Sequence, residues 1–570
     1  MRFIETDVLI LGGGIAGCFA ALGACKIANR VTLLEKSTVR RGGAVGPGMD
    51  QIMLGIGGPI PGAPTLEDVL RRAQSDETTS SISNFSSLVD QNIELYNARD
   101  SYDRLRDWEE IEPKIREDNG GYNVTFIPER FFFTLNVRGV NLKVRLGEAI
   151  RRISNLSVLE RTMGVDLLVD DGKVIGMVAL NTRTGEVIAF SAKSTVLASG
   201  IAARQFMETP EGLFMTWHCP SNVGDGQAMA YRAGADIINA EFGLMDYASC
   251  RQGGGVFGLH PFEKMPILRN RLGEKILRTM EDNRRRVILM VKELTEGRGP
   301  IYFDCSEMPD EEYKTMSRNM EHEYPITQKW FKQRGLDVRR DHIPVQVVPA
   351  GLYASVLVDE NGRGSLPGLY AGGDTMAGEG SLAGATLTGY RAGETAARDA
   401  LNEREPRPDE EQVRYIEKNI KAPLCRKSAV DPIDLEEAIR SINTDYIGYY
   451  KSEGMMQKGL ELILKLKSAH LPILGARNPH GLMRCMEVKN LIDVSEMHVR
   501  ASLMRRETRF SRMGMMHHVR LDYPEMDPLW GKWIVLRRED EEMTLSTREI
   551  PKIKESVKRE IEDEISRRRY

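Results

Sequence analysis

Residues 7–17 read Asp-Val-Leu-Ile-Leu-Gly-Gly-Gly-Ile-Ala-Gly, an apolar run that passes into a cluster of glycines. The run has the length and composition of a buried parallel strand, and the small, apolar residues 16–27 have helical potential. The glycines at positions 12, 14 and 17 have the GxGxxG spacing. In such a turn the first glycine permits a sharp bend, the second lets the backbone approach a pyrophosphate, and the third allows close packing of helix and strand. The stretch therefore predicts the strand, turn and helix that open a dinucleotide-binding fold.

A second buried strand, over residues 30–34, is followed directly by Glu35. The Glu35 carboxylate, 18 residues beyond Gly17, is placed to accept hydrogen bonds from an adenosine ribose. A glycine turn alone need not bind anything, but here strand, helix and acid all occupy their expected places, and a pyrophosphate would meet the positive end of the helix. The expected cofactor contacts in this part of the chain are Gly12, Gly14, Ile15, Ala16, Gly17, Glu35, Lys36, Gly42, Gly43 and Ala44.

A distant segment, residues 368–374 (Gly-Leu-Tyr-Ala-Gly-Gly-Asp), indicates which dinucleotide is bound. A strand that ends in Gly-Gly-Asp brings an acid and open backbone to a ribityl chain, which FAD has and NAD lacks. Residues 381–386 then begin a helix whose positive end can face the flavin ring and stabilise its reduced form. The same glycines would also permit close packing, and both roles are compatible. The predicted cofactor is FAD, with further contacts at Val165, Ser199, Gly200, Gly373, Asp374, Ser381 and Leu382.

The composition narrows the class of protein. Of 570 residues, 41% are hydrophobic and 28% charged, as in an ordinary globular protein. With 78 basic and 82 acidic residues, the charge does not indicate nucleic-acid binding. The seven cysteines form no CxxC pair, which favours reduced thiols and no iron–sulfur ligand set on this chain. There is no signal-peptide pattern and no membrane-spanning apolar run, so we expect a cytoplasmic protein.

The pattern along the chain predicts an α/β fold with an insertion. Strand patterns fill residues 124–200, with Asp170-Asp171-Gly172 as a hairpin turn. Glycines, prolines and a basic helix then interrupt the strands, and the last thirty charged residues favour a solvated helix or tail. The predicted division is a Rossmann-like FAD-binding domain over residues 1–240 and 344–405, an inserted α+β capping domain over residues 241–343, a C-terminal helical domain over residues 406–505, and a C-terminal segment over residues 506–570.

The motifs and their order resemble the succinate dehydrogenase/fumarate reductase flavoprotein superfamily. The residues that carry the resemblance are Gly12–Gly17, Glu35-Lys36, Gly42–Ala44, Thr295–Asp304 (TEGRGPIYFD), Gly368–Asp374, Arg505–Arg509 (RRETR) and Arg520–Pro524 (RLDYP). They cover nearly the whole chain. The resemblance implies an FAD-dependent oxidoreductase with an FAD domain, an inserted capping domain and a helical C-terminal domain.

The chain differs from the respiratory enzymes of that superfamily in the elements that attach FAD and bind the substrate. Residues 37–44 lack the histidine that carries covalent FAD in those enzymes, so the resemblance implies non-covalent FAD. The family's His-Pro-Thr-Gly, His-Tyr-Thr and Asn-Arg-Leu-Gly elements are replaced by Asp246–Ser249, Gly351–Ala354 and Ser381–Gly384. Leu or Ala cannot supply the paired hydrogen bonds that arginine makes to a carboxylate. A C4-dicarboxylate is therefore not the expected substrate.

The chain is more similar to the adenylylsulfate (APS) reductase alpha-subunit branch, in the loop after Glu-Lys and in the segment that begins with Ser381. That branch implies electron exchange with a ferredoxin-like subunit carrying 4Fe–4S clusters, and so a hetero-oligomer. The residues of that branch's nucleotide-sulfate pocket are not matched one by one in this chain. The expected substrate is therefore given as a class, a small anionic or heteroaromatic compound. The alternatives are a stand-alone fumarate reductase, succinate dehydrogenase or oxidase type, and a flavin-binding scaffold or RNA-modifying relative, which the balanced charge argues against.

Three consecutive arginines, Arg284, Arg285 and Arg286, are the main catalytic candidates. The superfamily places a functional arginine on this helix, facing the flavin, where a guanidinium can stabilise negative charge that develops on the substrate. Neighbouring side chains on a helix point about 100° apart, so only one or two of the three can face inward. Arg284 fits the motif offset best.

Other side chains are candidates with an equally good structural explanation. His260 is either an acid or base or a turn residue before a proline. Adjacent histidines at 517 and 518 are expected near the substrate and do not have the spacing of a metal pair. Trp217 and Tyr353 are expected to pack in the core rather than to stack on the flavin or the substrate.

Overall fold

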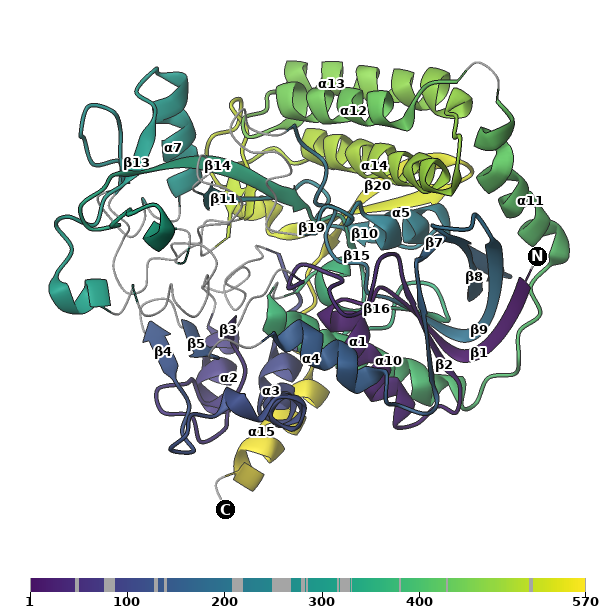
Figure 1. Cartoon of the computed structure of the whole chain (residues 1–570), viewed down its shortest axis with the longest axis horizontal. Helices are drawn as coiled ribbons and strands as arrows, with labels where there is room; N and C mark the ends of the chain where they lie inside the picture. Colours follow the sequence, from purple (N-terminus) through teal and green to yellow (C-terminus); the bar gives the residue numbers. More distant parts are fainter. Residues whose placement is uncertain are drawn as a thin grey trace.

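The computed structural model is dominated by a mixed seven-stranded sheet, here called the large sheet (Figure 1). The structure describes residues 2–46, 51–75, 88–127, 132–137, 141–207, 219–248, 268–277, 282, 285–314, 317, 329, 331–378, 381–426, 429–511 and 516–568. The strand order of the large sheet is β6-β2-β1-β9-β8-β7, and β16 also pairs with β9. Its strands are β1 (Arg2–Leu11), β2 (Val31–Glu35), β6 (Leu156–Glu160), β7 (Thr162–Asp170), β8 (Lys173–Asn181), β9 (Val187–Leu197) and β16 (Leu369–Ala371).

Residues on β1 alternate between the two faces of the large sheet, as a strand buried on both sides requires. Val8 and Ile10 pack with α1 (Ile15–Cys25) on one side, while Leu9 belongs to the core on the other. The strands predicted within residues 124–200 are confirmed. So is the hairpin at Asp170-Asp171-Gly172, which joins antiparallel β7 and β8 with φ of 45° at Asp171 and 71° at Gly172.

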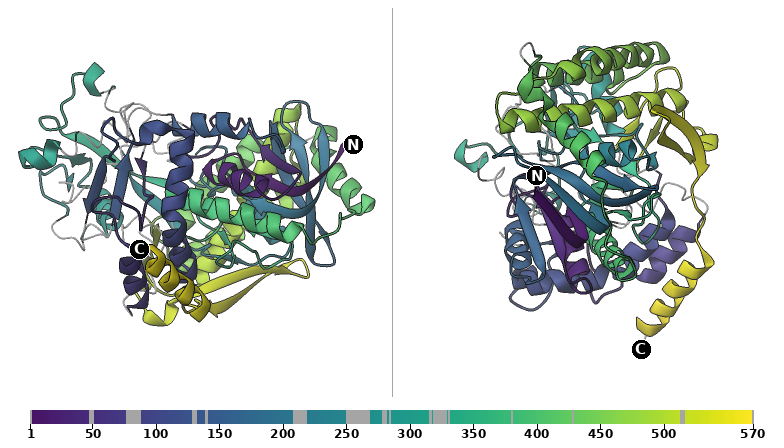
Figure 2. Two further views of the ribbon diagram at one scale, coloured as in Figure 1. Left: turned by 90° about the horizontal axis from the view of Figure 1, so that it is seen from below. Right: turned by 90° about the vertical axis from the view of Figure 1, so that its right-hand side faces the viewer.

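Two helices far apart in sequence, α1 and α10 (Leu382–Ala400), lie against each other beside the large sheet (Figures 1 and 2). A Cβ added to Gly389 would lie 2.3 Å from the Ala16 carbonyl oxygen, and one added to Gly393 would lie 2.0 Å from that of Ala20. Only glycine allows this backbone approach. The contact places the N-terminus of α10 beside the N-terminus of α1.

A six-stranded sheet contains the described strands of the predicted insertion. Its order is β12-β13-β14-β11-β18-β17, and α7 (Arg286–Thr295) packs against it. The last two strands come from the C-terminal segment, for which the sequence pattern predicts no strands. The members are β11 (Gly243–Ala248), β12 (Leu268–Arg269), β13 (Ile301–Phe303), β14 (Ile343–Leu352), β17 (Arg509–Phe510) and β18 (Met516–His518).

A four-stranded sheet also draws on the C-terminal segment, with the order β15-β10-β19-β20. Its strands are β10 (Ile237–Ile238), β15 (Ser355–Val356), β19 (Lys532–Glu539) and β20 (Glu542–Glu549). A smaller sheet contains β3 (Gln51–Ile52), β4 (Val124–Ile127) and β5 (Phe132–Asn136).

The helical stretches predicted after residue 406 are confirmed. The helices α11 (Glu410–Lys421), α12 (Pro432–Ile447), α13 (Glu453–Lys465) and α14 (Pro479–Met504) pack on the β7–β8 end of the large sheet. The charged C-terminus does form a helix, α15 (Glu555–Arg568), but it is not simply solvated. Val557 and Ile561 are buried against α2 (Leu66–Gln74) and α3 (Gln91–Ile111), beside which α15 lies at one edge of the molecule (Figure 2). None of the helices in the described ranges has the length and apolar character needed to span a membrane.

Candidate flavin site

The strands β1, β9 and β16 end together at one edge of the large sheet, here called the strand-end edge. The N–H of Ala198, just past β9, donates to the Leu11 carbonyl at 2.8 Å. The N–H of Gly372, just past β16, donates to the Leu197 carbonyl at 3.0 Å. The opening glycine turn and the late Gly-Gly-Asp segment therefore meet in space, as the sequence predicts. Ligands of open α/β sheets bind at such carboxyl ends.

The glycine turn has the geometry that its spacing predicts. Gly12 has a φ of 104°, which few other residues adopt. A Cβ on Gly17 would lie 1.7 Å from the Gly12 carbonyl oxygen, so no side chain fits there. A Cβ on Gly14, in contrast, would meet only the Cα of Gly43, at 3.7 Å. The loop that contains Gly43 therefore lies in contact with the turn, since a Cβ on Gly43 would lie 2.9 Å from the Gly14 Cα. Because both residues lack side chains, their main-chain atoms are left accessible to a pyrophosphate.

Glu35 joins the glycine turn to this loop. Its carboxylate accepts the N–H of Gly13 at 2.7 Å through Oε2 and the N–H of Ser37 at 2.6 Å through Oε1. The side chain is buried. Each carboxylate oxygen has a second lone pair, so Glu35 can hold the main chain and still accept a bond from a ribose hydroxyl.

Sequence reasoning missed Lys143, on α4 (Leu142–Ile150). Its side chain is 2% exposed, and its Nζ donates to the carbonyl of Val39 and lies 3.7 Å from the Sγ of Cys18. Cys18 Sγ in turn donates to the Gly13 carbonyl at 3.4 Å. Lys143 therefore fixes the loop behind the glycine turn and adds positive charge to a site expected to hold phosphate. No spacing pattern marks a single helical lysine.

Two threonines, also missed, position the late segment. The Oγ1 of Thr375 accepts the N–H of Gly200 at 3.0 Å, which ties the end of β9 to the residues after β16. The Oγ1 of Thr388 accepts the N–H of Gly373 at 2.8 Å. The predicted contacts Gly200 and Gly373 are therefore held at the strand-end edge by side chains that face it.

Asp374 has the properties expected of a group that contacts a bound hydroxyl. It is half-buried, and burial raises the pKa of its carboxyl to about 6. In the part of the chain that the structure describes, its carboxylate makes no hydrogen bond or ion pair. Nearby, Ser381 caps α10 with a φ of 121°, and its Oγ accepts the N–H of Gly384 at 3.4 Å. A non-glycine residue keeps such a conformation only where its surroundings impose it, and these residues cluster at ligand sites.

Two predicted contacts have other partners. The ammonium of Lys36 is buried and pairs with Asp225 at 2.8 Å and Glu487 at 3.0 Å, so its side chain binds the α5 (Asp225–Arg232) and α14 helices. Val165 lies within β7, where its side chain packs toward the helices and its carbonyl accepts from Arg232 at 2.9 Å. Neither side chain is directed at the glycine turn.

Of the catalytic candidates, the structure describes two arginines at the start of α7. Arg285 is exposed, whereas Arg286 is 1% exposed. Arg284, which fits the motif offset best, lies outside the described residues, as do His260 and Trp217. Of the two arginines that the structure describes here, Arg286 is therefore the buried one.

The remaining candidates are buried. His517 and His518 lie on β18, and Tyr353 follows β14. Burial lowers the pKa of His518 well below its ordinary value, so it is neutral at pH 7. Burial, with a further effect of Asp374, raises the pKa of the Tyr353 hydroxyl. The described residues contain no cluster of three or more histidine, cysteine or acidic side chains arranged to hold a metal.

Comparison with known proteins defines the class. The family described as "FAD binding domain" matches residues 120–389, and the family described as "Fumarate reductase flavoprotein C-term" matches residues 436–564. The chain is an FAD-dependent oxidoreductase flavoprotein. It belongs to the superfamily of the fumarate reductase and succinate dehydrogenase flavoproteins, in agreement with the sequence motifs.

Relatives cover nearly the whole chain. The chain is 27% identical to one of the subunits of the fumarate reductase (CoM/CoB) of Methanothermobacter marburgensis, over 94% of this chain and 98% of that protein. It is 26% identical to the L-aspartate oxidase of Yersinia pestis, over 91% and 96%. The fold is similar to that of adenylylsulfate reductase from Archaeoglobus fulgidus, with a TM-score of 0.82, 24% identity and coverage of 97% and 96%. It is also similar to E. coli quinol fumarate reductase FrdA, with a TM-score of 0.80, 19% identity and coverage of 97% and 99%.

Proposed function

We propose that this chain is the catalytic flavoprotein subunit of an oxidoreductase that exchanges electrons between a small anionic substrate and an iron–sulfur partner through non-covalent FAD. The observation that carries the proposal is the meeting of the glycine turn, the end of β9 and the Gly-Gly-Asp segment at the strand-end edge. Residues 37–44, which form the loop there, contain no histidine to anchor a flavin. The proposal places this protein in the cytoplasm.

Different residues at the strand-end edge would hold different parts of FAD. The main chain at Gly14 and Gly43 would hold the pyrophosphate, and Glu35 the adenosine ribose. Asp374 would accept from the ribityl hydroxyls, and the N-terminus of α10 would face the ring, where its dipole favours negative charge. When bound, FAD would supply the electron transfer that side chains cannot perform. In this proposal residues 1–240 and 344–405 hold FAD, residues 241–343 cap it, and residues 406–505 and 506–570 complete the subunit.

Arg286 is the side chain proposed to act on the substrate. Its guanidinium is always protonated at physiological pH and can stabilise negative charge that develops as electrons move. At positions 381–384, Ser-Leu-Ala-Gly supplies no cation that could pair with a carboxylate. The substrate is therefore proposed to be a small anion other than a C4-dicarboxylate, with adenylylsulfate the first compound to test.

An iron–sulfur partner is proposed because the cysteines of this chain do not have the spacing that binds a cluster. The seven cysteines form no CxxC pair, whereas the Methanothermobacter relative is named as one subunit of an enzyme. We expect iron and acid-labile sulfide in the native complex to accompany a second, smaller polypeptide. Iron bound by this chain alone would contradict the proposal.

A second candidate, a fumarate reductase type of enzyme, is supported by the same Methanothermobacter relative. Turnover of the FAD-loaded protein with reduced viologen distinguishes the two. We expect oxidation of the dye with adenylylsulfate or a related anion and little with fumarate. Rapid reduction of fumarate would instead support the second candidate and show that the replaced elements do not exclude dicarboxylates.

A further inference from the structure

Two neighbouring segments join the four-stranded and six-stranded sheets, in addition to the connection from β18 to β19 in the C-terminal segment. The outward crossing, residues 239–242, joins β10 to β11, and the return crossing, residues 353–354, joins β14 to β15. Because β10 pairs with β15 and β11 with β14, the two crossings run side by side. Each contains one residue in the left-handed region, Asn239 with φ 56° and Ala354 with φ 36°.

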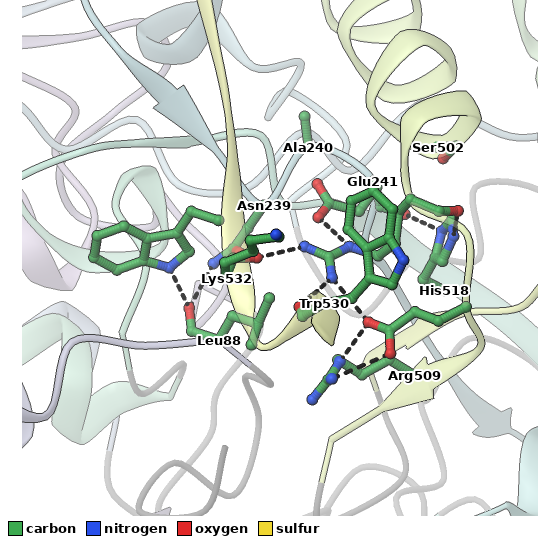
Figure 3. A network of polar contacts seen from close by, with 12 residues as sticks. Leu88, Asn239, Ala240, Glu241, Ser502, Arg509, His518, Trp530 and Lys532 are labelled. Atoms are coloured by element: carbon green, nitrogen blue, oxygen red, sulfur yellow. Dashed lines mark hydrogen bonds and ion pairs between the residues drawn. The ribbon is translucent and has the colours of Figure 1, made fainter. Parts of the chain in front are cut away.

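The two crossings are held very differently. On the outward crossing, His498 Nδ1 donates to the Ala240 carbonyl at 2.7 Å, as only a protonated ring nitrogen can. Asn239 Nδ2 donates to the Leu88 carbonyl at 2.9 Å, and Arg505 Nε donates to Glu241 Oε1 at 2.7 Å (Figure 3). Among the described residues, the side chains of the return crossing make no hydrogen bond.

Arg505 joins the outward crossing, through Glu241, to three residues of the C-terminal segment. Besides Glu241, its guanidinium donates to Glu507 Oε1 at 2.8 Å, to the Trp530 carbonyl at 2.7 Å and to the Lys532 carbonyl at 2.8 Å. The side chains of Glu241 and Arg505 are both 0% exposed. Loss of Glu241 removes one of the two carboxylates that pair with the buried Arg505 guanidinium and leaves Glu507 as the other.

The C-terminal segment that supplies these partners contributes strands to both sheets. Its β17 and β18 belong to the six-stranded sheet, and its β19 and β20 to the four-stranded sheet. His518, on β18, lies with Nδ1 3.3 Å from the Glu241 carbonyl oxygen and Nε2 3.2 Å from that of Arg505. The segment therefore pairs with the strands at both ends of the outward crossing, β19 with β10 and β18 with β11.

We infer that Glu241 is a positioning residue. Its ion pair with Arg505 fixes the outward crossing, and this keeps the six-stranded sheet, with Arg286 on α7, in a fixed position relative to the strand-end edge. The return crossing is bonded to the outward crossing by the Tyr353 N–H, which donates to the Phe242 carbonyl at 3.2 Å. The inference goes beyond the proposed function because it is independent of the substrate.

The test compares Glu241→Ala with Glu241→Gln, which keeps an oxygen that accepts from Arg505. For Glu241→Ala we expect hydrogen–deuterium exchange in β11 and β14 to accelerate by about ten-fold or more, since a charge-assisted bond to a local hinge is lost. We expect kcat to fall by a similar factor while the Kd for FAD stays within about two-fold. Glu241→Gln should recover most of both effects. Arg537→Gln, which removes an ion pair of β19 with Asp236 away from the crossings, is the matched control.

Two outcomes would overturn the inference. One is unchanged exchange and kcat in Glu241→Ala; the other is loss of FAD to the same extent as activity, which would indicate a general structural role. If Glu241→Ala does not fold, Arg505→Lys, which shortens the reach to Glu241 but keeps the charge, is measured in its place. The inference requires faster exchange in β11 and β14 and a lower kcat with unchanged FAD affinity, and unchanged exchange and kcat contradict it.

Discussion

The strand-end edge and the outward crossing are both buried junctions between distant parts of the chain, but different groups build them. At the strand-end edge the groups are main-chain amides and carbonyls, brought together because Gly12, Gly17 and Gly389 have no side chains. At the outward crossing they are charged side chains, chiefly Glu241 and Arg505, that are paired away from water. Close backbone approach excludes any added side chain, whereas a buried ion pair depends on the balance of the two charges.

The largest effect is expected at the glycine turn. Gly17→Ala would place a Cβ 1.7 Å from the Gly12 carbonyl oxygen, so helix and strand must separate. We expect the affinity for FAD to fall at least about 100-fold, measured by titration of flavin fluorescence. Gly454→Ala, on α13 where nothing lies within 4 Å of the new Cβ, should bind FAD as the unmutated protein does. Near-normal binding by Gly17→Ala would mean that this packing does not shape the site.

The second effect concerns the arginines of α7. Arg286→Met should lower kcat roughly 100-fold, the usual cost of losing one group that stabilises developing charge. Arg285→Met, at the exposed neighbouring position, should change kcat by less than about two-fold. Flavin content and circular dichroism check that Arg286→Met is folded. Equal losses in the two variants would show that burial does not identify the functional arginine.

A smaller effect is expected at Asp374. Asp374→Asn should weaken FAD binding by about ten-fold, because one charge-assisted bond to a hydroxyl is replaced by a neutral one. The ionised carboxylate is the stronger acceptor and its pKa in the unloaded protein is about 6, so affinity in the unmutated protein should decline as pH falls below that value. The affinity of Asp374→Asn for FAD should not decline over this pH range. A pH-independent affinity in both proteins would exclude Asp374 from the contact.

The last effect, on stability rather than on binding or turnover, concerns Lys451, which lies beside the outward crossing. Burial lowers the pKa of its ammonium to about 7; Glu241 opposes this shift and Arg520 adds to it. His498 and His518 also face it and are neutral, since their pKa values are lowered well below the ordinary value. In the unfolded chain a lysine keeps its proton up to about pH 10.4. Between pH 7 and that value the unfolded state binds more protons, so the stability of the native protein rises with pH.

Lys451→Met removes this dependence. Relative to the unmutated protein, its free energy of unfolding should be most favourable at pH 7 and below, by on the order of a few kcal/mol before the lost hydrogen bonds are counted. The difference should shrink toward pH 10. Urea denaturation at several pH values measures it. A difference that is constant with pH would show that Lys451 titrates normally.

The same contrast explains what can be predicted from the sequence. The glycine turn, Glu35 and the Gly-Gly-Asp segment are predicted to meet, because positions that accept only glycine leave a spacing pattern. Lys143 and the Glu241–Arg505 pair leave none, since a single charged residue acquires its partner only when the chain folds. The strand β19 escapes prediction because its apolar run of Trp533–Leu536 lies in a segment dominated by charge.

The central claim is that the strand-end edge binds one FAD without a covalent bond. Acid precipitation of the purified, FAD-loaded protein tests it most directly. The account predicts about one FAD per chain in the supernatant and a colourless pellet, as expected for a cofactor held only by the folded site. Flavin that remains with the precipitated protein would contradict it.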